Sequence, residues 1–105
     1  MSEAIVGFLV ARHVSGEWEL ENIVVSEESR GKGIGAGLLG ELFSRARLSG
    51  DSSVFLEVRE SNSAARGLYA KVGFEESGRR RGYYSNPQGD AVLYSKTLKK
   101  LPVSG

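Results

Sequence analysis

Residues 30–35 read Arg-Gly-Lys-Gly-Ile-Gly, which places two cations among glycines directly before an apolar pattern with helical spacing. Glycine lets the backbone approach a ligand closely, and the unpaired N–H groups in the first turn of a helix attract anions. Arg30 and Lys32 add charge of the kind that binds phosphate. The pattern R-x-x-G-x-G therefore predicts a pyrophosphate site. The alternative is a plain helix start with a glycine-rich lead-in.

Two other phosphate-binding patterns fit the sequence less well. A Walker A loop would need a glycine where Ser26 stands. The dinucleotide pattern G-x-G-x-x-G occurs over residues 35–40, but it begins inside the helical pattern instead of directly after a strand, and the chain is short for a doubly wound sheet. We therefore expect Gly37 and Gly40 not to contact phosphate but to let the helix lie close to the sheet.

Glu57 and Tyr69 are the residues that could move protons. Glu57 interrupts an otherwise apolar strand, and an isolated carboxylate in such a strand would have its pKa raised by desolvation into the range of a general base. The phenol of Tyr69 could donate a proton. From the residues alone, Glu57 could equally face solvent or pair with Arg59 or Arg66, and Tyr69 could be a packing residue.

Composition narrows the other possibilities. The 105 residues suggest a single domain, 1–105, with a net charge of +1, which argues against bulk binding of nucleic acid. The chain has no cysteine and only one histidine, His13, so we expect no metal site, disulfide or thiol nucleophile. We interpret His13 and Trp18 as hairpin residues, and Arg79–Arg81 as a solvated strand face. Without a signal sequence or an apolar run long enough to span a membrane, we expect a cytoplasmic protein.

The hydrophobic pattern predicts a mixed, mostly antiparallel sheet around a central βαβ unit with two helices, an α/β fold. Two hairpins are expected, from residues 5–14 and 17–25 and from residues 74–84 and 91–98. The apolar end of 17–25 predicts burial on both faces. A helix begins near Ile34 and stops at Gly50, a strand covers 53–59, and a second helix covers about 63–72 and stops at Gly73.

The combined stretches ENIVV, SRGKGIGAGLL and VFLEVRESNSAARGLYAKVGF resemble the Gcn5-related N-acetyltransferase (GNAT) family. The segments LEVR, SN, LY and GF, followed by RRRGYYSNPQGDA, are similar to its RimI-like branch, which acetylates protein N-termini. The resemblance implies an acetyl-CoA-dependent N-acetyltransferase whose acceptor is an α-amine such as the N-terminal alanine of ribosomal protein S18.

The resemblance also implies roles for individual residues. Glu57 is implied as the general base and Tyr69 as the general acid. Tyr83 and Tyr84 are expected to form walls of the acceptor site. The residues implied in binding acetyl-CoA are Ile23, Val24 and Val25 through their backbone, Arg30, the amides of Gly31, Lys32, Gly33, Ile34, Gly35 and Ala36, and Asn62 near the pantetheine end.

The sequence departs from the family in one respect. The family normally opens with a strand, two helices and a strand ahead of the segment matched here, so the resemblance implies a truncated GNAT fold. We expect residues 5–14 to form an uncovered strand edge and the chain to form a homodimer. A non-catalytic acyl-CoA-binding or partner module, and an acetyltransferase for small amines, remain as alternatives.

Overall fold

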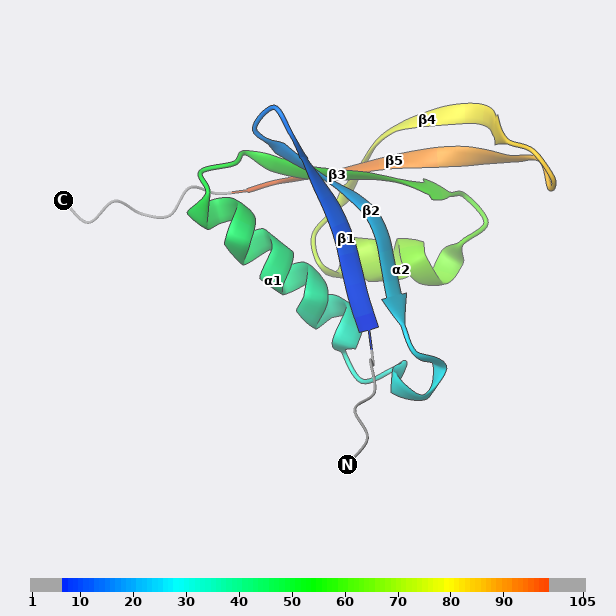
Figure 1. Cartoon of the computed structure of the whole chain (residues 1–105). Helices are drawn as coiled ribbons and strands as arrows, with labels where there is room; N and C mark the ends of the chain where they lie inside the picture. The colour runs from blue at the N-terminus through cyan, green and yellow to red at the C-terminus, as the bar shows by residue number, and fades with distance from the viewer. Residues whose placement is uncertain (1–6, 99–105) are drawn as a thin grey trace.

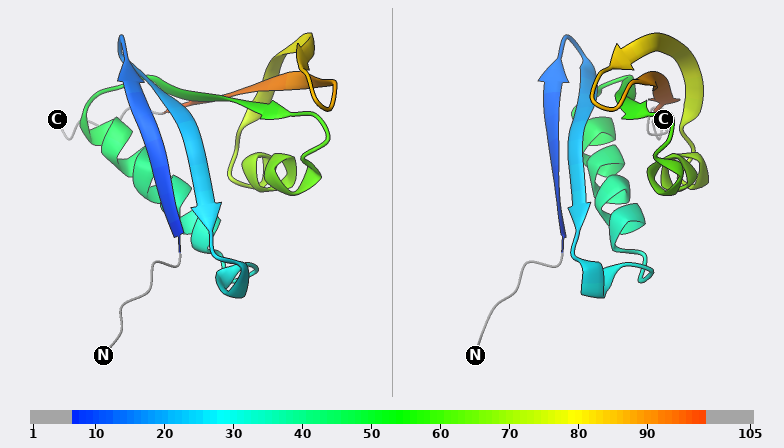
Figure 2. Two further views of the ribbon diagram at one scale, coloured as in Figure 1. Left: turned by 45° about the vertical axis from the view of Figure 1, so that its right-hand side comes forward. Right: turned by 90° about the vertical axis from the view of Figure 1, so that its right-hand side faces the viewer.

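The computed structural model describes residues 7–98, and two helices lie on one face of a single sheet (Figures 1 and 2). Residues 5 and 6 of the first predicted strand lie outside the described residues. The elements in chain order are β1 (Gly7–Val14), β2 (Glu17–Val25), a 3-10 turn (Glu27–Ser29), α1 (Ile34–Leu48), β3 (Ser53–Arg59), α2 (Ser63–Lys71), β4 (Glu75–Tyr84) and β5 (Gly89–Thr97).

The sheet has the order β1-β2-β3-β5-β4, and β2 and β3 are its parallel pair. The other neighbours pair antiparallel. α1 connects the two parallel strands, as expected for a βαβ unit. The structure thus confirms the predicted mixed, mostly antiparallel sheet.

The core lies between this sheet and the two helices. Leu39 and Ala46 on α1 and Val54 on β3 are fully buried, whereas Phe55 and Glu57 face away from α1. Burying one large apolar side chain contributes about 1.5–3 kcal/mol, which exceeds the helix-forming penalty of one glycine. Tertiary packing therefore holds a helix whose own sequence favours it weakly.

The glycines of α1 divide into two groups. A Cβ at Gly35 would lie 3.1 Å from Leu68 on α2, so this glycine permits a close approach of the two helices. A Cβ at Gly37 or Gly40 would meet nothing within 4 Å, and both residues are exposed. The expectation that Gly37 and Gly40 bring the helix close to the sheet was therefore wrong, since they lie on the solvent face.

β2 and β3 pair only at their beginnings and then run apart (Figure 2). The paired residues are Glu17–Glu19 and Ser53–Phe55. On the other side of β2, a register shift places Asn22 opposite Val10 and Leu20 opposite Ala11, which leaves Glu21 as the extra residue of a β-bulge. A bulge bends the strand that carries it and increases its twist.

This divergence overturns one prediction about β2. Its apolar end was expected to be buried on both faces, but Ile23 and Val25 are half-buried and Val24 is exposed. The reason is that β3 has already left β2 at this point and does not cover it. The apolar end of β2 faces a groove instead.

Candidate functional site

A groove follows the gap between β2 and β3 and consists of three hollows that share lining residues. The loop hollow, about 360 Å³, is lined by Val25, Ser29, Arg30, Gly31, Gly33, Ile34, Gly35, Ala36, Ala64, Leu68 and Lys71. The middle hollow, about 330 Å³, is lined by Ile23, Val24, Val25, Arg30, Ala64, Ala65, Leu68 and Tyr69. The strand hollow, about 270 Å³, is lined by Leu20, Glu21, Asn22, Ile23, Glu57, Val58, Arg59, Asn62, Ala65, Tyr69 and Tyr84.

The glycine-rich segment forms the wall of the loop hollow. Gly31 and Gly33 have φ values of 79° and 78°, a left-handed conformation that favours glycine. Gly33 is the N-cap of α1 and has no side-chain cap, so the first-turn N–H groups of the helix lack that partner. Open space lies above both glycines, and Arg30 lines the hollow while Lys32 is exposed in the same loop. These donors and charges suit a pyrophosphate.

α2 supplies the opposite wall, which the sequence analysis missed. Ala64, Leu68 and Lys71 line the loop hollow and lie at helical spacing on one face of α2. The sequence signal that could have indicated this wall is a small residue, an apolar residue and a cation on one face of the helix.

Asn62 has a structural task besides lining the strand hollow. Its Oδ1 accepts a hydrogen bond from the Ala65 N–H at 3.2 Å, which caps the N-terminus of α2. Tyr69 lies two turns further along this helix and contributes to both the middle and the strand hollow. The groove thus brings Asn62 and Tyr69 to the same end as Glu57.

Tyr69 is a buried phenol at the edge of the core. Its residue is 7 % exposed, and its ring packs edge-on against Phe74 with 5.6 Å between ring centroids. Burial raises the pKa of Tyr69 because the charged phenolate is poorly solvated there. The hydroxyl therefore keeps its proton through neutral pH, which suits a proton donor.

Glu57 is not the isolated carboxylate that the sequence suggested. Its Oε1 lies 3.2 Å from Arg80 Nε on β4, and its side chain is 29 % exposed. The cations considered from the sequence are engaged elsewhere. Arg59 stacks on the Tyr84 ring at 4.2 Å, and Arg66 pairs with Glu76 at 2.8 Å.

The β4–β5 hairpin closes the far end of the groove. Tyr83 and Tyr84 pack edge to face, with ring centroids 5.1 Å apart. They line a further space of about 320 Å³, the hairpin hollow, together with Glu19, Leu20, Glu21 and Glu57. The structure therefore brings both tyrosines to the same opening as Glu57.

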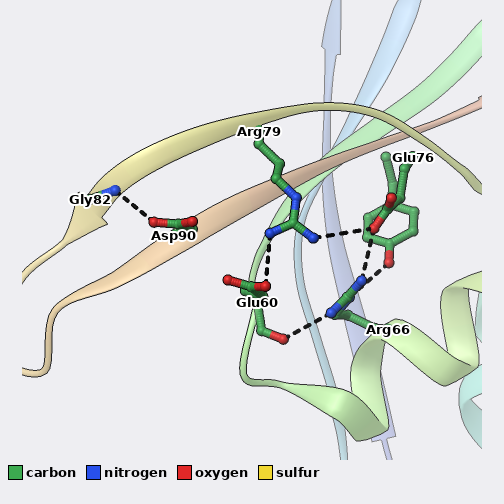
Figure 3. A network of polar contacts seen from close by, with 7 residues as sticks. Glu60, Arg66, Glu76, Arg79, Gly82 and Asp90 are labelled. Atoms are coloured by element: carbon green, nitrogen blue, oxygen red, sulfur yellow. Dashed lines mark hydrogen bonds and ion pairs between the residues drawn. The ribbon is translucent and has the colours of Figure 1, made fainter.

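An ion-pair network fixes the base of this hairpin against α2 (Figure 3). Arg79 pairs with Glu60 at 2.8 Å, and Arg66 joins Glu76 to the hydroxyl of Tyr94. Arg79 and Arg80 of the run 79–81 therefore both have carboxylate partners and are not free cations.

His13 on β1 and Trp18 on β2 form a second polar cluster near the turn of their hairpin, away from the residues that line the groove. The Trp18 indole donates to Asp51 at 2.7 Å, and His13 Nε2 lies 3.0 Å from the other carboxylate oxygen. These contacts tie the β1–β2 hairpin to the loop before β3, so the two residues have a structural task that the sequence did not indicate. Within residues 7–98 no group of acidic, histidine or cysteine side chains could hold a metal ion, and no helix is long and apolar enough to cross a membrane.

Comparison with known proteins agrees with this geometry. The family model for the acetyltransferase (GNAT) family matches residues 2–74. A [ribosomal protein bS18]-alanine N-acetyltransferase of Haemophilus influenzae is 44% identical over 85 residues, which cover 81% of this chain and 58% of that protein. The crystal structure of the ribosomal-protein-S18-alanine N-acetyltransferase from Escherichia coli has a TM-score of 0.83 at 32% identity, covering 92% of this chain and 64% of that one. Ard1 from Thermoplasma volcanium has a TM-score of 0.83 at 31% identity, with 90% and 64% covered.

The sheet with its splayed strand pair beside a glycine-rich helix start is an α/β domain, and its arrangement is similar to that of the acetyltransferase structures just described. The chain belongs to the GNAT acetyltransferase family. It spans about three fifths of the length of the Haemophilus relative.

Proposed function

We propose that the protein transfers the acetyl group of acetyl-CoA to an amine, in particular to the α-amine of a protein N-terminus. The observation that carries the proposal is the continuous groove: at one end lies the uncapped start of α1 with its glycines, and at the other lie Glu57 and Tyr69. The extended end of β2 forms one wall between them, with backbone groups that β3 does not cover.

Acetyl-CoA would supply an acetyl thioester at the strand hollow, with its pyrophosphate held by Arg30, Lys32 and the amides of residues 31–36. An α-amine has a pKa of about 7.7–8.0, so at neutral pH much of it is protonated and cannot attack. Glu57 accepts a proton from this amine, directly or through one water. Tyr69 gives its proton to the departing sulfur as the C–S bond breaks and the N–C bond forms. Each proton transfer typically contributes about 10²–10⁴-fold in rate.

The acceptor enters from the hairpin hollow, between Tyr83 and Tyr84 on β4 and the acidic residues of β2. The names of the relatives favour a ribosomal protein beginning with alanine as the acceptor. Such an acceptor is synthesised in the cytoplasm, which is where we place the protein.

We further propose that the chain forms a homodimer through β1. This strand lies at the end of the sheet order, and its Phe8, Val10 and Val14 are exposed. An outer strand with apolar side chains and unpaired backbone groups recruits another strand. Pairing of two β1 strands about a two-fold axis would give hydrogen-bond partners to the backbone groups of both edges.

Calorimetry on a glycine variant tests the binding site. Gly33→Glu places a side chain and a negative charge where the backbone has φ 78° and should face the pyrophosphate, so acetyl-CoA binding should be lost. Gly40→Glu adds the same charge on the solvent face of the same helix and should bind acetyl-CoA like the parent. Equal affinity of Gly33→Glu and the parent would show that this loop is not the coenzyme site.

A further inference from the structure

The opening of the groove beneath the β4–β5 hairpin carries three carboxylates, Glu19, Glu21 and Glu57. Arg12 on β1 binds the first two: its Nη2 lies 2.8 Å from Glu19 Oε1 and its Nε 3.2 Å from Glu21 Oε1. Glu57 is therefore the carboxylate of this opening that Arg12 does not neutralise.

Of the cations near Glu57, Arg80 is the one that pairs with it. Arg59 lies two residues further along β3 but stacks on Tyr84 and donates to the carbonyl of Pro87 at 2.9 Å. Arg80 reaches Glu57 across β5, because β5 lies between β3 and β4 in the sheet. Within residues 7–98 this is the one ion pair that either side chain makes.

The Arg80–Glu57 contact has the features of a weak pair. Its Nε–Oε1 distance of 3.2 Å is longer than the roughly 2.7–2.9 Å of a strong charge-assisted hydrogen bond. The Arg80 side chain is 56 % exposed, and exposed ion pairs contribute little to stability. The guanidinium carbon already lies over the Tyr83 ring, 5.6 Å from its centroid, so a cation–π contact holds Arg80 independently of the carboxylate.

We propose that Arg80 is a displaceable counter-cation of Glu57. The ammonium group of the acceptor takes its place at the carboxylate, while the guanidinium keeps its contact with the Tyr83 ring. This rests on the proposed function only for the identity of the acceptor. Glu57 has a cation beside it both before and after the exchange, so the carboxylate is never left unpaired. The exchange also brings the proton of the ammonium next to the carboxylate that receives it. An acceptor end without a positive charge has nothing to exchange and is selected against.

The proposal is tested by binding, without turnover. Alaninamide serves as the cationic probe and N-acetylalaninamide as its neutral counterpart, each titrated in the presence of CoA. The Glu57 carboxyl ¹³C resonance, assigned with Glu57→Gln, reports occupancy. Arg80→Ala removes the competitor, so alaninamide should half-saturate at a concentration about 2- to 5-fold lower than in the parent. Arg79→Ala, whose guanidinium pairs with Glu60 instead, should behave like the parent.

Losing a competitor raises the affinity for alaninamide, whereas losing structure lowers it. Alaninamide binding that is unchanged, weaker or undetectable in Arg80→Ala overturns the proposal, as does equal tightening for N-acetylalaninamide. Arg80→Gln, which keeps the stem of the side chain, replaces Arg80→Ala if the latter does not fold. Tighter alaninamide binding in a protein that transfers no acetyl group would retain the exchange and refute the proposed function. Acetyl transfer by the parent together with unchanged alaninamide affinity in Arg80→Ala would support the proposed function and refute the exchange.

Discussion

The phenol of Tyr69 and the carboxylate of Glu57 occupy different surroundings at the same end of the groove. Tyr69 is buried and keeps its proton, while Glu57 is partly open to solvent and paired with Arg80. The sequence analysis named both residues as the ones that could move protons. It did not predict the partner of Glu57, because a contact across an intervening strand depends on the register of β4, which shifts between Arg80 and Tyr84.

Replacing Tyr69 by phenylalanine tests the proton donor. Tyr69→Phe keeps the ring contacts with Phe74 and loses only the hydroxyl, so we expect kcat to fall by about 10²-fold or more while acetyl-CoA affinity stays nearly unchanged. Single-turnover rates and calorimetry measure the two quantities. A variant that keeps its kcat but melts at lower temperature would assign Tyr69 to packing alone.

Replacing Glu57 by glutamine tests the proton acceptor through its dependence on pH. Glu57→Gln should be most impaired at neutral pH, where the acceptor amine is largely protonated, and should recover towards about pH 9, where free amine is abundant. The rate–pH curves of parent and variant are compared under the same conditions. Parallel curves would contradict a role for Glu57 in accepting the proton.

At the scale of elements, the hydrophobic periodicity was sufficient for the βαβ unit, because α1 and β3 bury side chains at regular spacing. It was insufficient for the end of β2. A single inserted residue, Glu21, bends that strand away from β3, and an apolar run reads the same whether it faces a core or a groove. The wall formed by α2 was missed because an apolar residue such as Leu68 looks the same in the sequence whether it faces a core or a groove.

The solvent face of α1 yields a prediction about stability. Alanine at Gly37 or Gly40 meets open space and favours helix, so each substitution should raise the free energy of unfolding by about 0.5–1 kcal/mol. Gly35→Ala is the matched comparison, since its Cβ would lie 3.1 Å from Leu68 and should cancel the gain. Urea unfolding measures all three. Destabilisation by Gly37→Ala and Gly40→Ala would show that this face is covered.

The hydrogen bonds from His13 and Trp18 to Asp51 should make the free energy of unfolding depend on pH in the acid range. The hydrogen bond from His13 lowers the pKa of Asp51 below its ordinary value, the hydrogen bond from Trp18 adds to this, and partial burial opposes it. A carboxyl with a lowered pKa stabilises the folded state above its unfolded pKa, and that stability is lost as pH falls through the folded value. Asp51→Asn should therefore flatten the loss of stability below about pH 4. Identical urea curves at each pH for parent and Asp51→Asn would contradict this.

For the whole molecule, the outer strand β1 sets the expected state of association. If two β1 edges pair, the parent should sediment as more than one 11.3 kDa chain at micromolar concentration. Val10→Lys puts a charge on the exposed edge and should shift the protein to monomer. Leu48→Lys makes the same type of change on α1, outside the edge, and should leave association as it is. A parent that sediments as a monomer would refute the dimer.

The groove has one mouth between the two helices and another beneath the hairpin, and this arrangement bears on the order of events in a catalytic cycle. If acetyl-CoA enters through the first and the acceptor through the second, as proposed, neither reactant has to leave before the other arrives. The chain has no cysteine to carry the acyl group as a thioester, and we expect the proposed transfer to take place directly within a ternary complex. Double-reciprocal initial-rate plots should then intersect instead of running parallel, and an acetylated form of the protein should not accumulate when acetyl-CoA is present alone.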